Sequence, residues 1–309
     1  MPNLSLVIKE QIPAPLRLDR FISENLRLLS RSQIKARNLK AKINGKDVKL
    51  SRFVKYGDSL ELFWDESLPE NIIPQDIPLE IIYEDERCIV INKAQGMVVH
   101  PGAGNRQGTL ANALCFRSYE KGTGGLTGLR PGIVHRLDKD TSGIIIAAYN
   151  EEAHAFLAQQ FKTRKARKTY VAVTCGVPKE TKGRIEIFIA RDQKDRKRFT
   201  VSSKGKTSLT FYKVIKNWKN YSLVLLRPKT GRTHQLRVSM RYIGCPILGD
   251  PVYGYEDRYF PNASLMLHSK SLEITLPGET VPRVFSSPMP ERFNQLMERL
   301  DSVFPLFTG

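Results

Sequence analysis

Short apolar runs alternate with Gly and Pro turns from residue 79 to the end of the chain. Brief runs rich in Val, Ile, Tyr and Phe are typical of strands, and longer segments with apolar residues every three or four positions are typical of helices. The predicted strands cover 79–83, 88–92, 143–148, 169–173, 206–214, 222–227 and 271–276. The predicted helices cover 108–115, 151–161, 233–243 and 290–300. Many strands and few helices indicate an α+β fold with a largely antiparallel mixed sheet.

A smaller group of elements is predicted near the N-terminus. Four apolar residues recur there at helical spacing: Leu18, Phe21, Ile22 and Leu26. The segment 30–32 can cap a second short helix that carries Ile34 and Leu39. Asn44-Gly45 predicts a hairpin turn because both residues tolerate positive φ, and a strand follows at 60–62. This group of elements predicts a small domain of its own.

The charge pattern separates that small domain from the rest of the chain. Residues 16–63 carry 12 Lys/Arg and 5 Asp/Glu, a net +7, whereas residues 65–86 carry 8 acidic residues and no basic one. Three prolines fall in the acidic stretch, which indicates a linker. The predicted organisation is therefore an N-terminal extension (1–15), a small basic domain (16–64), an acidic linker (65–78) and a large domain (79–309).

Composition indicates the kind of partner. The 309 residues carry 49 Lys+Arg against 31 Asp+Glu, a formal net charge of +18. A surplus of this size favours a polyanionic partner, usually nucleic acid, although a merely basic surface gives the same count. The four cysteines are far apart in sequence, and the N-terminus lacks the pattern of a secretory signal. We expect a soluble, cytoplasmic protein that does not enter membranes.

The densest polar cluster is HRLDKDTSG at 135–143, which lies between two apolar runs. Charged residues placed there must face a cleft or a sheet edge, because burial without partners costs several kcal/mol. Asp138 is the candidate reactive carboxylate, and residues 141–143 can form a turn that points it outward. The alternative is that Asp138 and Asp140 only cap the turn.

Two further clusters carry candidate chemistry. In KTGRTHQLR (229–237), Thr233 can cap a helix and Arg237 follows one turn later. An arginine beside a buried carboxylate favours its ionised form, which nucleophilic or base chemistry requires. His234 is interpreted as a hydrogen-bonding residue, since no His spacing suits a metal site. The basic run 162–170 ends at Tyr170, which can stack on an unstacked base, or can simply be a core tyrosine.

The N-terminal segments RLDRFISE, LSRSQIKARNLKAKINGKDV and VKYGDSLEL resemble the S-four-like RNA-binding domain. This chain reads Asn38-Leu39-Lys40 where that family usually has a glycine before the hairpin strand. Nearly the whole chain, from this N-terminal module to the C-terminal VFSSPMPERF, resembles pseudouridine synthases of the RluA/RluD family. The resemblance rests on six motifs in order: YEDERCIVINKAQGMVVHPGAGNRQGTLANAL, GIVHRLDKDTSGIIIAA, RKTYVAV, PKTGRTHQLRVSM, GCPILGDPVYG and LHSKSLEI.

The resemblance implies roles for individual residues. Asp138 matches the catalytic aspartate, Tyr170 the tyrosine that contacts the target base, and Arg237 the basic residue paired with the aspartate. Arg136 matches the arginine that enters the RNA where the target uridine has left. Further RNA contacts are expected from His135, Arg232, Arg31, Lys35 and Lys165. The chain departs from the family pattern at Ala94 and Ser239, outside the three central roles.

The resemblance further implies a pseudouridine-synthase catalytic fold and an isomerase that acts on uridines, most closely of the branch that modifies large-subunit (23S) ribosomal RNA. The reaction involves no redox change, so neither a cofactor nor a metal is expected, and we expect a monomer. The aspartate can attack the sugar or the base, or abstract a sugar proton. The alternatives are a synthase acting on transfer RNA and a non-catalytic RNA-binding ribosome assembly factor.

Overall fold

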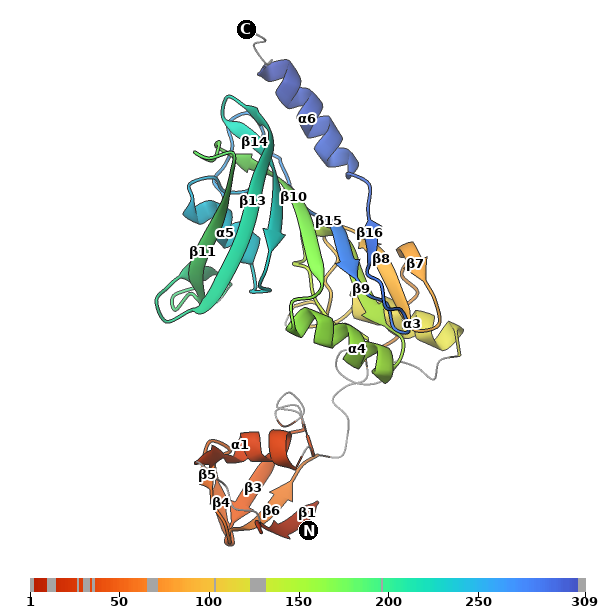
Figure 1. Cartoon of the computed structure of the whole chain (residues 1–309), viewed down its shortest axis with the longest axis vertical. Coiled ribbons are helices and arrows are strands. Elements are labelled where there is room, and N and C mark those ends of the chain that lie inside the picture. The colour runs from red at the N-terminus through yellow and green to blue at the C-terminus, as the bar shows by residue number, and fades with distance from the viewer. Residues whose placement is uncertain are drawn as a thin grey trace. The chain divides into compact units, whose positions relative to one another are not determined.

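The structure is a computed structural model that describes residues 3–9, 15–26, 28–29, 34, 37–65, 72–102, 104–122, 132–195 and 197–304. The chain divides into two compact units, Met1–Asn71 and Ile72–Gly309 (Figure 1). The division falls inside the segment 65–78, where the charge pattern predicts a linker. The two units are described separately below.

The N-terminal unit is a short helical segment with a four-stranded sheet in the order β1-β6-β3-β4 and a separate β2-β5 pair. Its elements are β1 (Leu4–Val7), β2 (Leu16–Arg17), α1 (Leu18–Arg20), the π-helical turn η1 (Phe21–Asn25), β3 (Lys40–Ile43), β4 (Lys46–Val48), β5 (Phe53–Val54) and β6 (Ser59–Phe63). Leu18, Phe21 and Ile22 are buried on one face, as their spacing predicts. The predicted second helix falls on residues that mostly lie outside the described part of the chain.

Two asparagines set the backbone direction around the hairpin of this unit. Asn44 (φ 52°) and Gly45 (φ 77°) form the turn between β3 and β4, which confirms the predicted hairpin. Asn38 also adopts a left-handed conformation, with φ 47°. Asparagine tolerates this region better than other residues with a side chain, so it can stand where a glycine is usual. The Asn38 side-chain amide also donates a 2.9 Å hydrogen bond to Asp65.

The larger unit contains a ten-stranded sheet and four helices within the described residues. The strands are β7 (Glu80–Glu84), β8 (Cys88–Lys93), β9 (Ser142–Ala148), β10 (Arg167–Cys175), β11 (Lys182–Arg191), β12 (Phe199–Val201), β13 (Lys206–Trp218), β14 (Tyr221–Pro228), β15 (Leu267–Ile274) and β16 (Arg283–Ser286). The helices are α3 (Leu110–Glu120), α4 (Glu151–Lys162), α5 (Gln235–Tyr242) and α6 (Glu291–Val303). Each strand and helix predicted for this unit overlaps an observed one, which confirms the α+β class.

The sheet runs β12-β11-β13-β14-β10-β15-β9-β8-β7, with β16 paired to β15. Among the described strands every pairing is antiparallel except that of β15 with β9, where His268 lies opposite Ser142. Figure 1 shows β10 and β15 near the middle of this order, between the β11–β14 half and the β7–β9 half. The parallel pair brings the segment that precedes β9 to the middle of the sheet.

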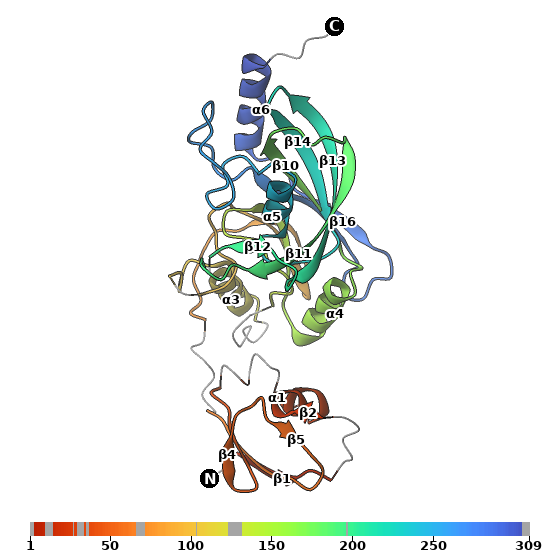
Figure 2. The ribbon, with the colours of Figure 1, turned by 90° about the vertical axis from the view of Figure 1, so that its left-hand side faces the viewer.

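Alternating apolar residues give the sheet two buried faces around β8 and β9. Ile89 and Ile91 pack in one core cluster with α3, whereas Val90 and Ile146 pack in another with α4. In the other half of the sheet, α5 packs against β11, β13 and β14, as Figures 1 and 2 show. Helices therefore hold the strands on both sides of the point where the polar motifs converge.

Three strands of the larger unit, β11, β12 and β16, lie outside the ranges predicted from the sequence. β11 has a clear period of two, with Ile185, Ile187 and Ile189 buried and the residues between them more exposed. No strand was predicted there, although this alternation is the signal of a half-covered sheet strand.

No helix within the described ranges is both long and apolar enough to cross a bilayer.

Candidate active site

Asp138 lies in a tight turn directly before β9. The Thr141 N–H donates a 3.1 Å hydrogen bond to the Asp138 carbonyl, and the strand begins at Ser142. The expectation of a turn at 141–143 is therefore wrong by three residues, because Ser142 and Gly143 already pair with β15. Gly143 has φ 107°, and a Cβ there would overlap the Ser269 backbone. The close approach of β15 therefore requires glycine at this position, and it places the turn with Asp138 at the centre of the sheet.

A buried lysine holds this turn in place through hydrogen bonds to backbone carbonyls. Lys93, at the end of β8, is 1% exposed, and its ammonium donates hydrogen bonds to the carbonyls of Ala94, Met97 and Lys139 at 2.8–3.0 Å. Burial lowers the pKa of Lys93 to about 8, and the nearby acidic charges of Asp140 and Asp138 oppose that shift. Three satisfied donors make the buried cation tolerable and tie the Asp138 turn to β8.

Arg237 connects Asp138 to a second carboxylate. Its Nε and Nη2 donate to Asp250 at 2.7 and 2.6 Å, and its Nη1 lies 3.7 Å from Asp138 Oδ2. The side chain of Asp250 is fully buried, and Asp250 also accepts hydrogen bonds from the backbone N–H groups of Val252 and Tyr253. The two-pronged contact fixes the guanidinium plane, so its remaining nitrogen faces Asp138.

His234 lies on the other side of the same carboxylate. It precedes α5 with φ 56° and makes no side-chain cap, so the expectation that Thr233 caps this helix is wrong. Its Nδ1 is 2.8 Å from the Tyr253 hydroxyl, and its Nε2 is 4.0 Å from Asp138 Oδ2. Burial lowers the pKa of His234, although the Asp138 charge opposes this. The ring is therefore a hydrogen-bonding residue, as predicted, and Arg237 is the positive charge nearest Asp138.

Tyr170, in β10, completes the group around Asp138. The residue is 7% exposed, and it lines the same cavity as Asp138. Burial raises the pKa of the Tyr170 phenol, the negative charge of Asp138 adds to that effect, and a hydrogen bond with Ser269 opposes it. The phenol therefore carries its proton at neutral pH and presents a ring and a hydroxyl group to the cavity.

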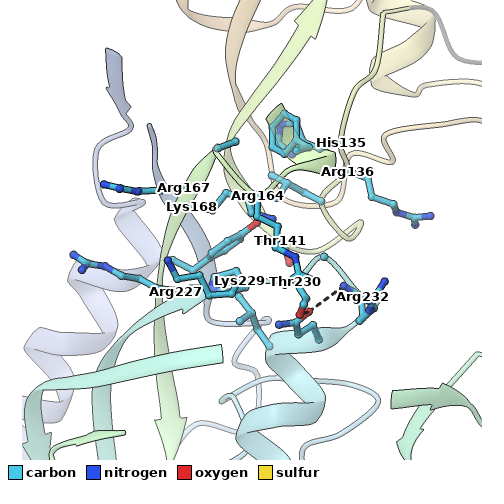
Figure 3. Close-up of a pocket in the computed structure, with 18 of the residues that line it drawn as sticks. His135, Arg136, Thr141, Arg164, Arg167, Lys168, Arg227, Lys229, Thr230 and Arg232 are labelled. Carbon is cyan, nitrogen blue, oxygen red and sulfur yellow. Dashed lines mark hydrogen bonds between the residues drawn. The ribbon is translucent and has the colours of Figure 1, made fainter. Parts of the chain in front are cut away.

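The cavity lies where the turn before β9, the start of β10 and the connection from β14 to α5 meet. Its volume is about 1030 Å³, at the upper end of the range for small-molecule sites. Its charged lining is strongly cationic, and the acidic residues in it are Asp138 and Glu273. The cationic residues of the lining are Arg136, Lys162, Arg164, Arg167, Lys168, Arg227, Lys229, Arg232 and Arg237. Figure 3 shows that the labelled cations come from several segments around one space: Arg136, Arg164, Arg167, Lys168, Arg227, Lys229 and Arg232. Such a lining suits a phosphate-bearing ligand that brings a ring next to Asp138.

The other predicted contact residues lie in different settings. Arg136 is exposed and lines the cavity, and Arg232 lines it while donating to the Thr207 carbonyl at 3.0 Å. His135 stacks on Phe161 and accepts a hydrogen bond from the Ile146 N–H. Burial lowers the pKa of His135 to about 3, so this ring adds no positive charge.

The remaining predicted contacts lie away from the cavity lining or outside the described structure. Lys165 is exposed and is absent from the cavity lining. Arg31 and Lys35 lie outside the described residues, so their expected contact with RNA stays a prediction. The cavity therefore brings together Asp138, Tyr170 and Arg237 with part of the predicted contact set.

Several site residues were missed by sequence reasoning. Asp250 and Tyr253 belong to the GDPVYG motif, which was recognised without a role for either residue. Lys168 lines the cavity, lies 5.9 Å from the Phe161 ring centroid, and has a pKa lowered by burial. Its signal was present in the basic run 162–170. Lys93 belongs to the first of the six motifs but was given no role, because one lysine at a strand end is usually exposed.

The described residues contain no group of three or more His, Cys, Asp or Glu side chains placed to hold a metal ion. Asp138 is 18% exposed at its side chain, so it can reach a ligand in the cavity while Arg237 stays behind it. A carboxylate, a phenol and a cationic wall around one cavity can bind a nucleotide and act on its sugar or base.

Comparisons with known proteins agree with this chemistry. A family model described as RNA pseudouridylate synthase matches residues 87–242. The chain is 46% identical to "Ribosomal large subunit pseudouridine synthase D" of Borreliella burgdorferi, over 90% of this chain and 87% of that protein. It is 42% identical to the protein of the same name from Zymomonas mobilis, over 82% and 81% of the two chains. The solved structure of human RNA Pseudouridylate Synthase Domain Containing 4 has a TM-score of 0.59 and 26% identity, and the match covers 72% of this chain and 92% of that one.

Proposed function

The chain belongs to the RNA pseudouridylate synthase family, and from this we infer that it converts uridines of large-subunit ribosomal RNA to pseudouridine. The observation that carries the choice of substrate is the 46% identity, over nine-tenths of the chain, to a relative named for the large ribosomal subunit. The cationic cavity around Asp138 is consistent with an RNA substrate.

The reaction is an isomerisation that needs no added atoms. The bond between the sugar carbon C1′ and the base nitrogen N1 breaks, the base turns, and C1′ bonds to carbon C5. The proton leaves C5, and N1 gains one. We assign the reactive carboxylate to Asp138, which can attack the sugar or the base, or abstract a sugar proton. Each of these routes needs an ionised oxygen facing the cavity with a positive charge behind it, and Arg237 supplies that charge at 3.7 Å.

We assign Tyr170 to contact with the target base. Its buried ring lines the cavity beside Asp138, where a base withdrawn from the RNA stack can pack against it. Because burial raises its pKa, the phenol of the free protein is a hydrogen-bond donor rather than a base. Withdrawal of the base costs a few kcal/mol, least in a loop. Stacking on Tyr170, together with insertion of the exposed Arg136 into the gap, offsets that cost.

We propose that the N-terminal unit adds RNA affinity. Residues 16–63 carry a net charge of +7, and the left-handed Asn38 removes one objection to the S-four-like assignment. A single chain supplies Asp138, Arg237 and Tyr170, so we propose that the protein works as a monomer, in the cytoplasm where ribosomes are assembled. A purely RNA-binding assembly factor would need the cationic surface but would not need an arginine held between two carboxylates.

The test is to incubate the purified protein with unmodified transcripts and to map pseudouridines chemically. One transcript is the organism's large-subunit ribosomal RNA, and the matched controls are its small-subunit ribosomal RNA and a transfer RNA pool. We expect pseudouridine at defined positions of the large-subunit transcript and none in the controls. Modification of transfer RNA alone would show that the substrate class is wrong, and modification of none would contradict the proposed function.

A further inference from the structure

An exposed aromatic ring lies between two arginines on the outer face of the sheet. Phe211 of β13 pairs with Arg184 of β11 on one side and with Arg227 of β14 on the other. Residues paired across neighbouring strands point to the same face, so these three side chains form one row. Phe211 is 39% exposed, and both arginines are exposed. The described residues place no carboxylate within ion-pair distance of either arginine.

The neighbouring rows on this face of the sheet also carry exposed cationic side chains. Lys182 lies directly opposite Lys213, and Lys229 lies beside Leu209, whose carbonyl accepts its N–H at 2.9 Å. All three lysines are exposed. Together these side chains form what we call the Phe211 patch: Lys182, Arg184, Phe211, Lys213, Arg227 and Lys229. The acidic residue that shares these rows is Glu186, opposite Leu209. Like charges directly opposite each other destabilise a sheet, and a polyanion lying on the patch would remove that penalty.

The opposite face of the same strands is closed by packing. Ile185, Ile187 and Ile189 of β11 are buried on that side, where α5 contacts the strands. The exposure of Phe211 is therefore a property of the outer face and not of a strand that lacks a core.

The patch is continuous with the cavity of the candidate active site. Phe211, Arg227 and Lys229 line that cavity together with Asp138. Figure 3 shows Arg227 and Arg167, from the neighbouring strands β14 and β10, extending toward the same side of the site. An RNA strand whose target nucleotide sits beside Asp138 can therefore pass directly from the cavity onto the patch.

We propose that the Phe211 patch is a binding subsite for the RNA strand flanking the target uridine, with one unpaired base stacked on Phe211 and its phosphates held by Arg184 and Arg227. The inference rests on the proposed function, because it takes RNA as the substrate. An exposed ring with cations on both sides matches the chemistry of single-stranded nucleic acid, in which a flat base alternates with charged phosphates. Arginines also stack on bases, which suits the row of three.

The experiment measures binding of the full-length protein to an end-labelled transcript of the organism's large-subunit ribosomal RNA, over a series of salt concentrations. Phe211→Ala is compared with Phe188→Ala, since Phe188 is an exposed aromatic on the same face of β11 and lies outside the cavity. We expect Phe211→Ala to weaken binding about tenfold and Phe211→Trp to restore it. Arg184→Gln should lower the salt slope of log K by about 0.7, the value for one phosphate contact on a single strand. Phe188→Ala should bind as the wild type does.

The outcomes separate this subsite from the proposed function. If the wild type forms pseudouridine but Phe211→Ala and Arg184→Gln bind the transcript as it does, the patch is not an RNA subsite and the function stands. If the wild type forms none, the function fails, and the affinities still test the patch. Thermal melting identifies a folding defect. If Phe211→Ala melts much lower than Phe188→Ala, the comparison of Phe211→Trp and Arg184→Gln with the wild type decides, and unchanged affinity and salt slope in both overturn the proposal.

Discussion

At the scale of single residues, the site depends on one guanidinium shared by two carboxylates. Arg237 gives its two-pronged contact to Asp250 and only one nitrogen, at 3.7 Å, to Asp138. Asp250 is buried, and its position is set by backbone N–H groups as well as by Arg237. Asp250 therefore acts as a positioning residue, and Asp138 remains exposed enough to meet a substrate.

Replacing Asp250 tests this arrangement. Asp250→Asn removes the charge that holds Arg237, so we expect a loss of about 3–5 kcal/mol in the free energy of unfolding. The misplaced guanidinium should also lower kcat for pseudouridine formation by about 100-fold. The control is Asp257→Asn, because Asp257 is a buried carboxylate that accepts from the Tyr221 hydroxyl and does not line the cavity. Equal kcat values for the two folded variants would contradict the role of Asp250.

Buried histidines make stability depend on pH. His268 is fully buried between the Ser142 and Ser287 hydroxyl groups, and burial lowers its pKa from 6.5 to about 4, with a further contribution from the charge of Arg292. Between pH 6.5 and about pH 4, His268 binds a proton in the unfolded chain but not in the folded protein. The free energy of unfolding therefore falls as the pH falls through this range. We expect the His268 contribution to drop by about 2 kcal/mol between pH 7 and pH 5.

The measurement is urea unfolding of the wild type and His268→Gln at both pH values. The variant should show a pH dependence that is weaker by about that same 2 kcal/mol. An identical pH dependence in the two proteins would show that His268 titrates normally.

The sequence predicts the central residues of the site but not the buried residues that hold them in position. Asp138, Tyr170 and Arg237 were singled out because recognisable motifs carry them, and all three line one cavity. Asp250 was missed because the turn that brings it to Arg237, 13 residues earlier, is a property of the folded loop. Lys93 was missed for a related reason, since its three carbonyl partners come from backbone positions that no residue type reveals.

At the scale of elements, the parallel contact of β9 and β15 positions the site. Gly143 allows it, because a side chain there would overlap the Ser269 backbone and φ is 107°. The strands predicted at 143–148 and 271–276 were found, but β15 begins at Leu267, four residues before its predicted start. Those four residues include the polar His268 and Ser269, which local pattern places in a loop and which become strand because Ser142 and Gly143 lie beside them.

A substitution at this crossing should be costly. Gly143→Ala adds a Cβ in a left-handed conformation against the neighbouring backbone, so we expect a loss of at least about 3 kcal/mol in the free energy of unfolding. Gly244→Ala is the control, since Gly244 also has positive φ but has open space around its Cβ position. It should cost about 1–2 kcal/mol. Denaturant unfolding of both variants checks this, and equal losses would show that the strand crossing tolerates a methyl group.

At the scale of the whole molecule, the net charge of +18 is distributed over two compact units. The larger unit contains the cavity, and we propose that the smaller one contributes affinity. The boundary between the units falls in the acidic, proline-bearing segment that separates two basic regions of the sequence. The segment 1–15, in contrast, is expected to be a separate extension, whereas β1 (Leu4–Val7) pairs with β6 in the sheet of the smaller unit. The order of the strands in the sheet could not be predicted, because pairings such as β14 with β10 join residues far apart in the chain.

The contribution of the N-terminal unit is tested by a double substitution. Arg31→Glu with Lys35→Glu should weaken RNA binding and lower the salt slope of log K, because two phosphate contacts are lost, by about 1.6. Pseudouridine formation in the bound complex should persist. Filter binding across salt concentrations provides the slope. Unchanged affinity at low salt would remove these residues from the RNA path.

The central claim is that Asp138 performs the chemistry in a cavity that binds RNA independently of it. Asp138→Asn keeps the shape of the side chain and removes its charge. The most direct measurement is pseudouridine formation by this variant on bound large-subunit ribosomal RNA. We predict affinity at least equal to that of the wild type, because a negative charge has left a cationic cavity, together with complete loss of product. Pseudouridine formed by Asp138→Asn would contradict the account.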